Sequence, residues 1–463
     1  MTQNAPESAG NIVKFQISSN FTDNAVELSA GVVDFRYYEN VLSNSVTATA
    51  TCVETGYQSD DSGGATGQQS TVDGLPIRGG ERTDITIEDA YGNQLTFEEG
   101  LYVNRLRDVD PGTSKDLYFI DFASREFFAN EQTRVVKKYE GNIGDNVEKI
   151  LKDVLKVTSD IEIDNTAVPY NFIGNDRKPF YICTWLASKS IPEIATEDAK
   201  TGIKGAAGYL FFQTRDGYHF KSIDKTFTGK PKKKFIFNNS TQLPEGYDAK
   251  VLTYDINSDI DVGKNLMMGM YNNRSIFFDP LAFNYEVRSF PKAETPSIEG
   301  DIVGEETAVP SEDDYIALTE NAGVEPVNKL IPDEFRQSPT RFMSFITDNG
   351  VMPSGIDSQE QLNTWSSEKT KDNYDFKNTA SQSIMRYSQL FTVKTEITIP
   401  GDFTIKAGDI IKCDFPDLSG SEVKDVNPET QGTYMVASVC HRITPTSSST
   451  SLSLVRDSFG DKK

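Results

Sequence analysis

Residues 391–420 read FTVKTEITIPGDFTIKAGDIIKCDFPDLSG, and this stretch decides the fold class. Its first apolar side chains stand at odd positions, with polar ones between them: Phe391, Val393, Ile397 and Ile399. A period of two is typical of a half-buried β-strand, because successive side chains point to opposite faces. Pro-Gly-Asp and Ala-Gly-Asp then divide the stretch into three strands. Nothing in it indicates chemistry, so it predicts a β scaffold.

The first third of the chain repeats this pattern. Residues 45–53, SVTATATCV, alternate small apolar residues with threonine. Residues 54–80 are rich in Gly, Ser, Gln and Asp, and we expect them to be a long excursion from a hairpin. Strand patterns resume at DITIED, turn at Tyr91-Gly92-Asn93 and continue to DLYFIDF. Several short strands with turn signals indicate a sandwich or a barrel.

The period changes near residue 124. Phe127, Phe128 and the following QTRVVKKY predict a helix. Apolar residues at i, i+3, i+4, i+7 and i+8 predict a second, amphipathic helix: Val147, Ile150, Leu151, Val154 and Leu155. A third helix is expected over residues 180–191. The region therefore reads as a small α/β or α+β domain.

Strands return at residues 208–223, where Arg215-Asp216-Gly217 supplies a hairpin turn. Residues 291–328 are rich in Pro, Glu and Asp and indicate a linker. A short helix is expected from Ala380 to Phe391, before the opening strands. GTYMVASVCHRI and TSLSLVRD then close the unit, which places an insertion near 255–380 between strands.

Composition narrows the class of protein. The chain has 463 residues and a formal charge of −23, which argues against a nucleic-acid binder, since binding to a duplex depends on Lys and Arg. It does not exclude DNA passing nearby. The N-terminus shows no secretory signal, and no apolar run is long enough to span a membrane. We therefore expect a soluble protein made in a cytosol.

A credible catalytic or metal-binding cluster is missing. The four cysteines form no C-x-x-C pair, and only His219 and His441 could supply imidazole. Cys440 and His441 are adjacent in a strand, so their side chains should point to opposite faces. The basic run at 230–234, KPKKK, is interpreted as a solvated turn, with contact to an acidic surface or DNA backbone as the less favoured reading. Neither an enzyme nor a bound cofactor is predicted.

Several stretches together resemble one family, the baseplate hub proteins of T-even-like contractile phages. YYENVLSNSVTATATCV at 37–53 resembles the entry to its first barrel, and PFYICTWLASKSI with AAGYLFFQTRDGYHFKSID resembles its middle. The opening stretch, with GTYMVASVCHRI and LSLVRD, resembles its second barrel. The motif residues are Tyr38, Glu39, Leu42, Trp185, Leu186, Gly208, Gly217, Phe220, Asp224, Gly401, Gly408, Asp409, Gly432, Tyr434, Val436 and His441.

The resemblance implies a mainly β fold with two antiparallel β-barrels, an α/β accessory domain and an inserted domain. The expected boundaries are 1–123 for the first barrel, 124–205 for the accessory domain, 206–254 plus 381–463 for the second barrel, and 255–380 for the insertion. The family is also similar to the N-terminal part of secretion-system spike proteins. Because no spike or lysozyme segment follows residue 457, the piercing part is expected to be a separate chain.

The same resemblance implies partners and a location. Three chains would form a ring that joins a three-fold central spike to the six-fold tail tube or a tube-initiator ring. Wedge proteins would surround it, and DNA would pass through its channel without specific binding. The location would be the tail baseplate of a virion assembled in the bacterial cytoplasm.

Two functions from other classes remain open. A tail-associated cell-wall hydrolase would need a carboxylate pair in a cleft, which one sequence cannot locate. A receptor- or glycan-binding tail module would need exposed aromatic residues on the insertion, such as Trp365.

Overall fold

The fold is that of a computed structural model, which describes the chain except residues 1–9, 22, 55–56, 59–67, 70, 98, 112–114, 168, 194–206, 228–229, 239–241, 258–260, 280–283, 291–331, 333–339, 347–376, 417–425, 428–429 and 458–463. The predicted linker at 291–328, Trp365 and much of the excursion at 54–80 lie outside the described residues. The described residues are mainly β-strand, so the predicted fold class is confirmed at that level.

Strands from the first 123 residues form one antiparallel sheet, in the order β2-β1-β7-β9-β10-β4-β3, with β8 beside β7. Their bounds are β1 (Asn11–Ser18), β2 (Ala25–Glu27), β3 (Val32–Asn40), β4 (Thr47–Glu54), β7 (Arg82–Glu88), β8 (Gln94–Thr96), β9 (Leu101–Pro111) and β10 (Asp116–Ala123). Alternation explains the core, because every second residue from Phe35 in β3 and from Ala48 in β4 is buried. The predicted turn at Tyr91-Gly92-Asn93 joins β7 to β8.

Through the pairing of β3 with β24 the first sheet continues into a second set of strands, which we call the second sheet and which follows the order β17-β16-β23-β24-β25-β22-β18. Its bounds are β16 (Lys233–Ile236), β17 (Ala249–Lys250), β18 (Thr253–Asn257), β22 (Val393–Pro400), β23 (Ile410–Asp414), β24 (Gly432–Ile443) and β25 (Ser448–Arg456). The stretch that opened the sequence analysis supplies β22 and β23. Its apolar positions Val393, Ile397 and Ile399 lie in the core, as the period of two predicts.

In each sheet, one continuous segment of the chain forms hydrogen bonds with strands near both ends of the strand order. Val251 N–H donates to Ile236 of β16 at 2.9 Å, and the next residue, Leu252, donates to Thr398 of β22 at 2.7 Å. In the first sheet, Leu28 N–H donates to Phe15 of β1, while β3, a few residues on, pairs with β4. No sheet of the described residues closes into a barrel through continuous strand pairing, so the two predicted barrels are not confirmed.

An α+β unit follows β10. It holds the three-stranded sheet β12-β15-β14, the pair β11-β13 and several helices. The bounds are α2 (Arg125–Gln132), β11 (Lys138–Tyr139), α3 (Ile143–Lys149), the π-helix η1 (Ile150–Val154), β12 (Asp160–Ile163), β13 (Phe172–Ile173), α4 (Pro179–Ala187), β14 (Tyr209–Thr214), β15 (Gly217–Ser222) and α6 (Ile223–Phe227). The amphipathic helix is confirmed as α3 with η1. The predicted helix through QTRVVKKY is wrong beyond Gln132, because β11 pairs with β13 there.

Residues assigned by sequence to the second barrel divide between two sheets. β14 and β15 form the predicted Arg215-Asp216-Gly217 hairpin, but β15 pairs with β12 of the α+β unit in parallel. β16, β17 and β18 instead belong to the second sheet. The domain boundaries stay a prediction.

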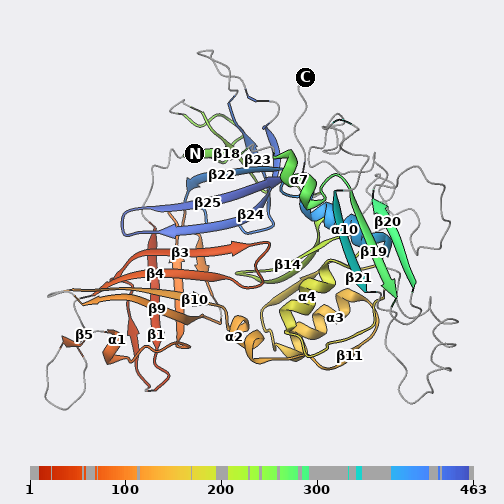
Figure 1. Cartoon of the computed structure of the whole chain (residues 1–463). Coiled ribbons are helices and arrows are strands. Elements are labelled where there is room, and N and C mark those ends of the chain that lie inside the picture. The colour runs from red at the N-terminus through yellow and green to blue at the C-terminus, as the bar shows by residue number, and fades with distance from the viewer. Residues whose placement is uncertain are drawn as a thin grey trace.

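The insertion contains α7 (Val262–Met268) and a sheet in the order β20-β19-β21, with bounds β19 (Asn273–Asp279), β20 (Asn284–Phe290) and β21 (Arg341–Ile346). Helix α10 (Lys377–Gln389), which matches the predicted short helix, lies against this sheet (Figure 1). The remaining short elements are β5 (Tyr57–Gln58), β6 (Gln68–Gln69) and α1 (Thr71–Gly74). Among the described residues, none of the helices has the length and apolar character that crossing a bilayer requires.

Candidate functional site at the junction of the two sheets

The two sheets meet where β3 pairs with β24. The pairing is antiparallel, with Tyr38 opposite Cys440 and Tyr37 opposite His441. The N-terminal part of β24 pairs with β23, its C-terminal part pairs with β3, and β25 lies along its other side. One sheet surface therefore runs from β22 across β25, β24, β3 and β4 to β10, and these strands lie side by side in Figure 1.

Hydroxyl side chains dominate the outward side of this surface, which we call the hydroxyl face. Ser451 lies opposite both Thr398 and Cys440, and Tyr38 lies opposite Thr47. Alternation gives the remaining members, which are not buried: Thr49, Thr51, Ser449 and Ser453. The inward side holds buried residues such as His441 and Phe35. The same register also places Lys394, Glu396, Leu117 and Phe119 on the outward side, so the hydroxyl face is mixed but rich in small hydroxyl side chains.

Arginines near the β3–β24 pairing contact carboxylates on the hydroxyl face. The Arg36 guanidinium lies 2.7 Å from Asp34, and Arg442 Nε donates to the same carboxylate at 2.8 Å. The hydrogen bond to Asp34 raises the pKa of Arg36. On the next strands, Arg107 Nε donates to Asp121 at 3.0 Å, and Thr49 donates to Asp121 at 3.1 Å. Asp34 therefore serves two arginines and Asp121 one, so these carboxylates offset most of the arginine charge on this face.

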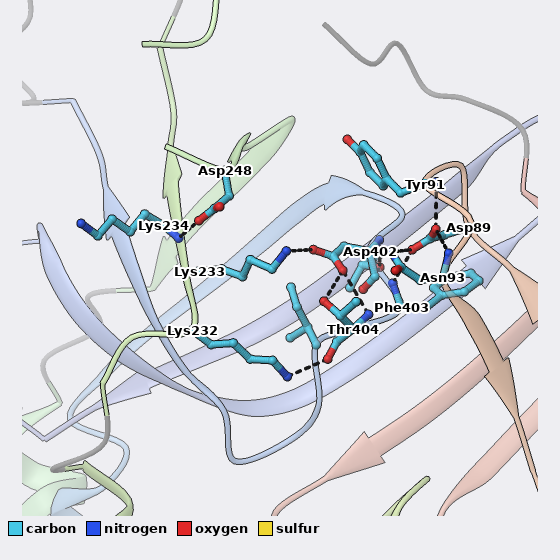
Figure 2. A network of polar contacts seen from close by, with 12 residues as sticks. Asp89, Tyr91, Asn93, Lys232, Lys233, Lys234, Asp248, Asp402, Phe403 and Thr404 are labelled. Atoms are coloured by element: carbon cyan, nitrogen blue, oxygen red, sulfur yellow. Dashed lines mark hydrogen bonds and ion pairs between the residues drawn. The ribbon is translucent and has the colours of Figure 1, made fainter. Parts of the chain in front are cut away.

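A polar network fixes residues 401–409, the segment between β22 and β23, against the first sheet. Figure 2 shows Asp89, from the β7–β8 turn, accepting hydrogen bonds from the backbone of its own turn and of Phe403. The Phe403 N–H lies 2.9 Å from Asp89 Oδ2. Asp89 therefore joins the two sheets through backbone groups, which no apolar contact could satisfy.

Two lysines of the basic run complete the network. Lys233 Nζ lies 3.3 Å from Asp402, and Lys232 Nζ donates to Asp409 and to the Thr404 carbonyl, each at 2.8 Å. Burial alone would raise the pKa of Asp402, but hydrogen bonds from Thr404 and the Lys233 ammonium lower it. The interpretation of KPKKK as a solvated turn is wrong for Lys233, which begins β16 and whose ammonium lies against Asp402 (Figure 2), whereas Lys232, just before the strand, is exposed.

Glu39 fastens the β14–β15 hairpin to the same place. Its buried carboxylate accepts from Arg215 N–H at 2.9 Å, from Ala407 N–H at 2.8 Å and from the Tyr37 hydroxyl at 2.9 Å. Burial raises the pKa of Glu39 in spite of these hydrogen bonds. Arg215 also donates to the carbonyls of Phe403 and Thr404. One carboxylate thus connects β3, the hairpin and residues 401–409.

His441 is a structural imidazole. Its Nε2 lies 3.1 Å from the Ile405 carbonyl, which can only accept, so Nε2 holds the proton and Nδ1 accepts from Thr450 at 3.0 Å. Burial lowers the pKa of His441 to about 3. Cys440 points to the opposite, hydroxyl face, as the alternation predicts. The pair is therefore no nucleophile and base.

The motif residues divide between this junction and other places. Tyr38, Glu39, Gly401, Gly408, Asp409 and His441 lie at the junction. Gly408 has a φ of 86° and a Cβ there would lie 2.9 Å from the Phe212 ring, so glycine allows the segment to approach β14. Elsewhere lie Trp185 and Leu186 in α4, Gly208, Gly217 and Phe220 around β14 and β15, Asp224 in α6, Gly432, Tyr434 and Val436 in β24, and Leu42, exposed after β3.

Sequence reasoning missed Asp89 and Arg215 as members of the junction. Asp89 begins a turn, and Asp is common there because its carboxylate accepts from the following backbone. Its bond to Phe403 spans 314 positions and has no local signal.

One hydroxyl–imidazole–carboxylate chain exists in the α+β unit. Thr214 Oγ1 lies 2.8 Å from His219 Nε2, and His219 Nδ1 lies 3.1 Å from Glu162. The Thr214 hydroxyl is buried and also accepts from Asp216 N–H, so a substrate could not reach it. Burial lowers the pKa of His219 to about 4. Across the described ranges, His, Cys, Asp and Glu form no group that could hold a metal ion.

The chain resembles solved phage tail proteins. No family model and no curated protein matches it. A tail protein from Neisseria meningitidis has a TM-score of 0.49 and 9% identity, covering 97% of both chains. The 43 kDa tail protein of a Shewanella oneidensis prophage has a TM-score of 0.49 and 8% identity, covering 96% of this chain and 98% of its own. An Escherichia coli component of the type VI secretion system has a TM-score of 0.41 and 8% identity, covering 94% and 76%.

These structural neighbours are tail proteins and secretion-system components, the same classes that the sequence stretches resemble. At these low identities and with TM-scores below 0.5, the neighbours show only that the chain is similar to them.

Proposed function

We propose that the chain is a structural subunit of a phage tail baseplate, the hub, which forms a three-fold ring around a channel for DNA. The observation that supports this most directly is the hydroxyl face. It spans both sheets without interruption, its arginines near the β3–β24 pairing contact carboxylates, and many of its other members are Ser and Thr.

Such a face suits a channel wall. Nucleic acids are held chiefly by unpaired Lys and Arg that displace counterions from phosphates. A wall whose arginines contact carboxylates offers less of this attraction, yet its hydroxyls remain wettable. The hydroxyl face would therefore let a duplex slide past without retaining it.

The junction supports the same function mechanically. Asp89, Glu39 and the β3–β24 pairing fix the two sheets against each other through buried polar contacts. A subunit that matches a three-fold spike to a six-fold tube needs two similar units at a fixed angle. The two sheets, each with one segment that bonds at both edges, are candidates for those units, and the partners would be the spike, the tube and the wedge proteins.

Negative-stain electron microscopy of the purified chain tests the proposal. We expect three-fold rings with an axial hole wide enough for duplex DNA, alone or after addition of the neighbouring spike protein. Monomers on both grids would contradict the hub function. A zymogram against peptidoglycan tests the hydrolase alternative, for which the buried Thr214 gives no support; a clear lysis band would revive it.

A second candidate function follows from the insertion. The outer face of the β20-β19-β21 sheet exposes Phe278 beside Tyr285 and Ile346, with Val287 and Phe342 nearby. Exposed aromatic rings of this kind favour a binding role, such as a receptor- or glycan-binding module. A glycan-binding screen of the full chain, with Tyr285→Ala as the matched variant, tests this function. Absence of any signal would exclude glycan binding.

A further inference from the structure

One edge of the α+β unit combines exposed apolar groups with cations. Residues 135–139 run antiparallel to 172–177, with Lys138 opposite Ile173 and Val135 opposite Arg177. Val136 is 67% exposed, Ile173 53% and Tyr181, at the start of α4, 54%. The Arg177 guanidinium stacks over the Tyr181 ring at 5.3 Å. We call this edge the socket.

The socket is positively charged, although the whole chain is acidic. Its cations are Arg134, Lys137, Lys138, Arg177 and Lys178, and its carboxylates are Glu131, Glu140 and Asp176. Lys138 pairs with Glu140, and Lys178 pairs with Glu131. Lys137 and Arg177 are exposed and form no ion pair among the described residues, and Arg134 contacts only backbone carbonyls. The socket thus offers cations around an apolar centre.

The free end of the β9–β10 hairpin has the opposite character. Asp108, Val109 and Asp110 are all exposed, and Val109 is 44% exposed. The register shifts between Leu117 and Phe119, so Asp108 and Val109 form a β-bulge, and Asp108 has a φ of 50°. A bulge re-aims the side chains of its strand. We call residues 108–110 the knob.

The knob keeps a negative charge. Arg107 contacts Asp108 at 3.5 Å, but its two closest contacts, at 3.0 and 3.3 Å, are to Asp121. Asp108, Asp110 and Asp116 outnumber the cations that neighbour them in the sequence, Arg107 and Lys115. The knob therefore presents one apolar side chain between two carboxylates. This arrangement complements the apolar centre and the surrounding cations of the socket.

The knob and the socket of one chain are far apart. β10 runs from Asp116, beside the knob, to Ala123, and α2 of the α+β unit begins two residues later. Eight residues of strand put these ends roughly 25 Å apart. In Figure 1, β9 and β10 lie on the opposite side of α2 from β11 and α4. Contact between them therefore requires a second copy.

We propose that the knob of one copy docks into the socket of the next copy, with Val109 against Val136 and Ile173 and with Asp108 and Asp110 facing Lys137 and Arg177. The contact joins two different surfaces, so it is head-to-tail, and repetition closes a ring if the rotation fits. This inference rests on the proposed ring and adds the surfaces that hold it together.

Reciprocal charge reversal tests the contact. Lys137→Glu and Asp110→Lys each change an exposed side chain. A chain that carries both substitutions again has opposite charges on the two sides of every contact. We expect each single variant to raise the concentration of half-assembly in sedimentation velocity by about tenfold or more, and the combined variant to recover most of it. Lys264→Glu, an exposed reversal on α7, is the control and should leave assembly unchanged. Circular dichroism checks that every variant is folded.

The outcomes separate the contact from the hub function. Rings of wild-type protein that persist unchanged in both single variants overturn the contact and leave the hub function intact. Loss of assembly in the singles without recovery in the combined variant also overturns it. A wild-type chain that stays monomeric at every concentration overturns the docking of the knob into the socket. Electron microscopy of the chain mixed with the spike protein then decides whether the hub function holds.

Discussion

Single buried polar residues hold the junction together. Glu39 accepts from two backbone N–H groups and a tyrosine hydroxyl, Asp89 from three backbone N–H groups, and His441 bridges Thr450 and the Ile405 carbonyl. In each case at least one partner is a backbone group of a segment without regular structure. Such segments cannot satisfy themselves, so the side chain determines where they lie.

Replacing Glu39 tests this at the residue scale. Glu39→Ala leaves the N–H groups of Arg215 and Ala407 buried without an acceptor, and each such group costs about 1–3 kcal/mol. We expect the free energy of unfolding to fall by about 3 kcal/mol, measured as a lower urea midpoint by circular dichroism. Glu396→Ala, on the exposed side of β22, should change it by less than about 0.5 kcal/mol. Equal effects of the two changes would contradict the role of Glu39.

The two histidines predict how stability depends on pH. Burial lowers the pKa of His441 to about 3 and that of His219 to about 4, below the ordinary 6.5. The unfolded chain therefore binds these protons first, so stability is full above pH 6.5 and falls as the pH drops toward 4. At pH 5 each histidine costs about 2 kcal/mol.

Melting curves check this sign. The melting temperature of His441→Gln should fall less between pH 7.5 and pH 5 than that of the wild type. Because both proteins share the same carboxylates, the difference isolates the histidine. Parallel curves would mean that His441 is protonated in the folded chain.

At the scale of elements, local patterns predicted individual strands and helices but not their assembly. Alternation predicts β22, β24 and β25, and the apolar stripe predicts α3 with η1, because each burial pattern is written in neighbouring residues. The helix beyond Gln132 failed because pairing of β11 with β13 outweighed helical propensity. The β3–β24 pairing joins residues about four hundred positions apart, and no local period reports such a contact.

The contact between β12 and β15 gives a sharp test of one element. Gly217 has a φ of 144°, and a Cβ there would lie 1.9 Å from the Asp160 carbonyl oxygen, which β12 holds in place. Gly217→Ala should therefore separate the two strands and lower the melting temperature strongly. Gly92→Ala is the matched control, since Gly92 also has a positive φ but no atom within 4 Å of the added Cβ. It should cost only about 1 kcal/mol. Similar effects would mean that the clash relaxes.

At the scale of the whole molecule, net charge and local charge differ. The chain has a charge of −23, yet its hydroxyl face holds arginines that contact carboxylates, and its socket is cationic. Composition predicted that the protein does not bind DNA, but only the fold reveals that the arginines of the face are masked by Asp34 and Asp121.

Unmasking these arginines should create DNA retention. In Asp34→Asn with Asp121→Asn, we expect a gel shift of duplex DNA at low salt that disappears as salt rises, because Arg36, Arg442 and Arg107 become free for phosphates. The wild type should give no shift. Asp23→Asn with Asp145→Asn, at exposed sites elsewhere, makes the same change in net charge and should also give none. A shift with the control pair would attribute the effect to net charge alone.

Strand β24 has a consequence for how the molecule bears load. Six residue pairs connect it to β3, from Ser438 with Asn40 to Ile443 with Phe35. A pull along the strand direction would have to rupture these pairs together, as a shear, whereas a pull across the strands would open them one after another. The β3–β24 pairing is thus stiff along the strand direction and weak across it. A tail that drives its tip through an envelope would gain from orienting this stiff axis along the thrust.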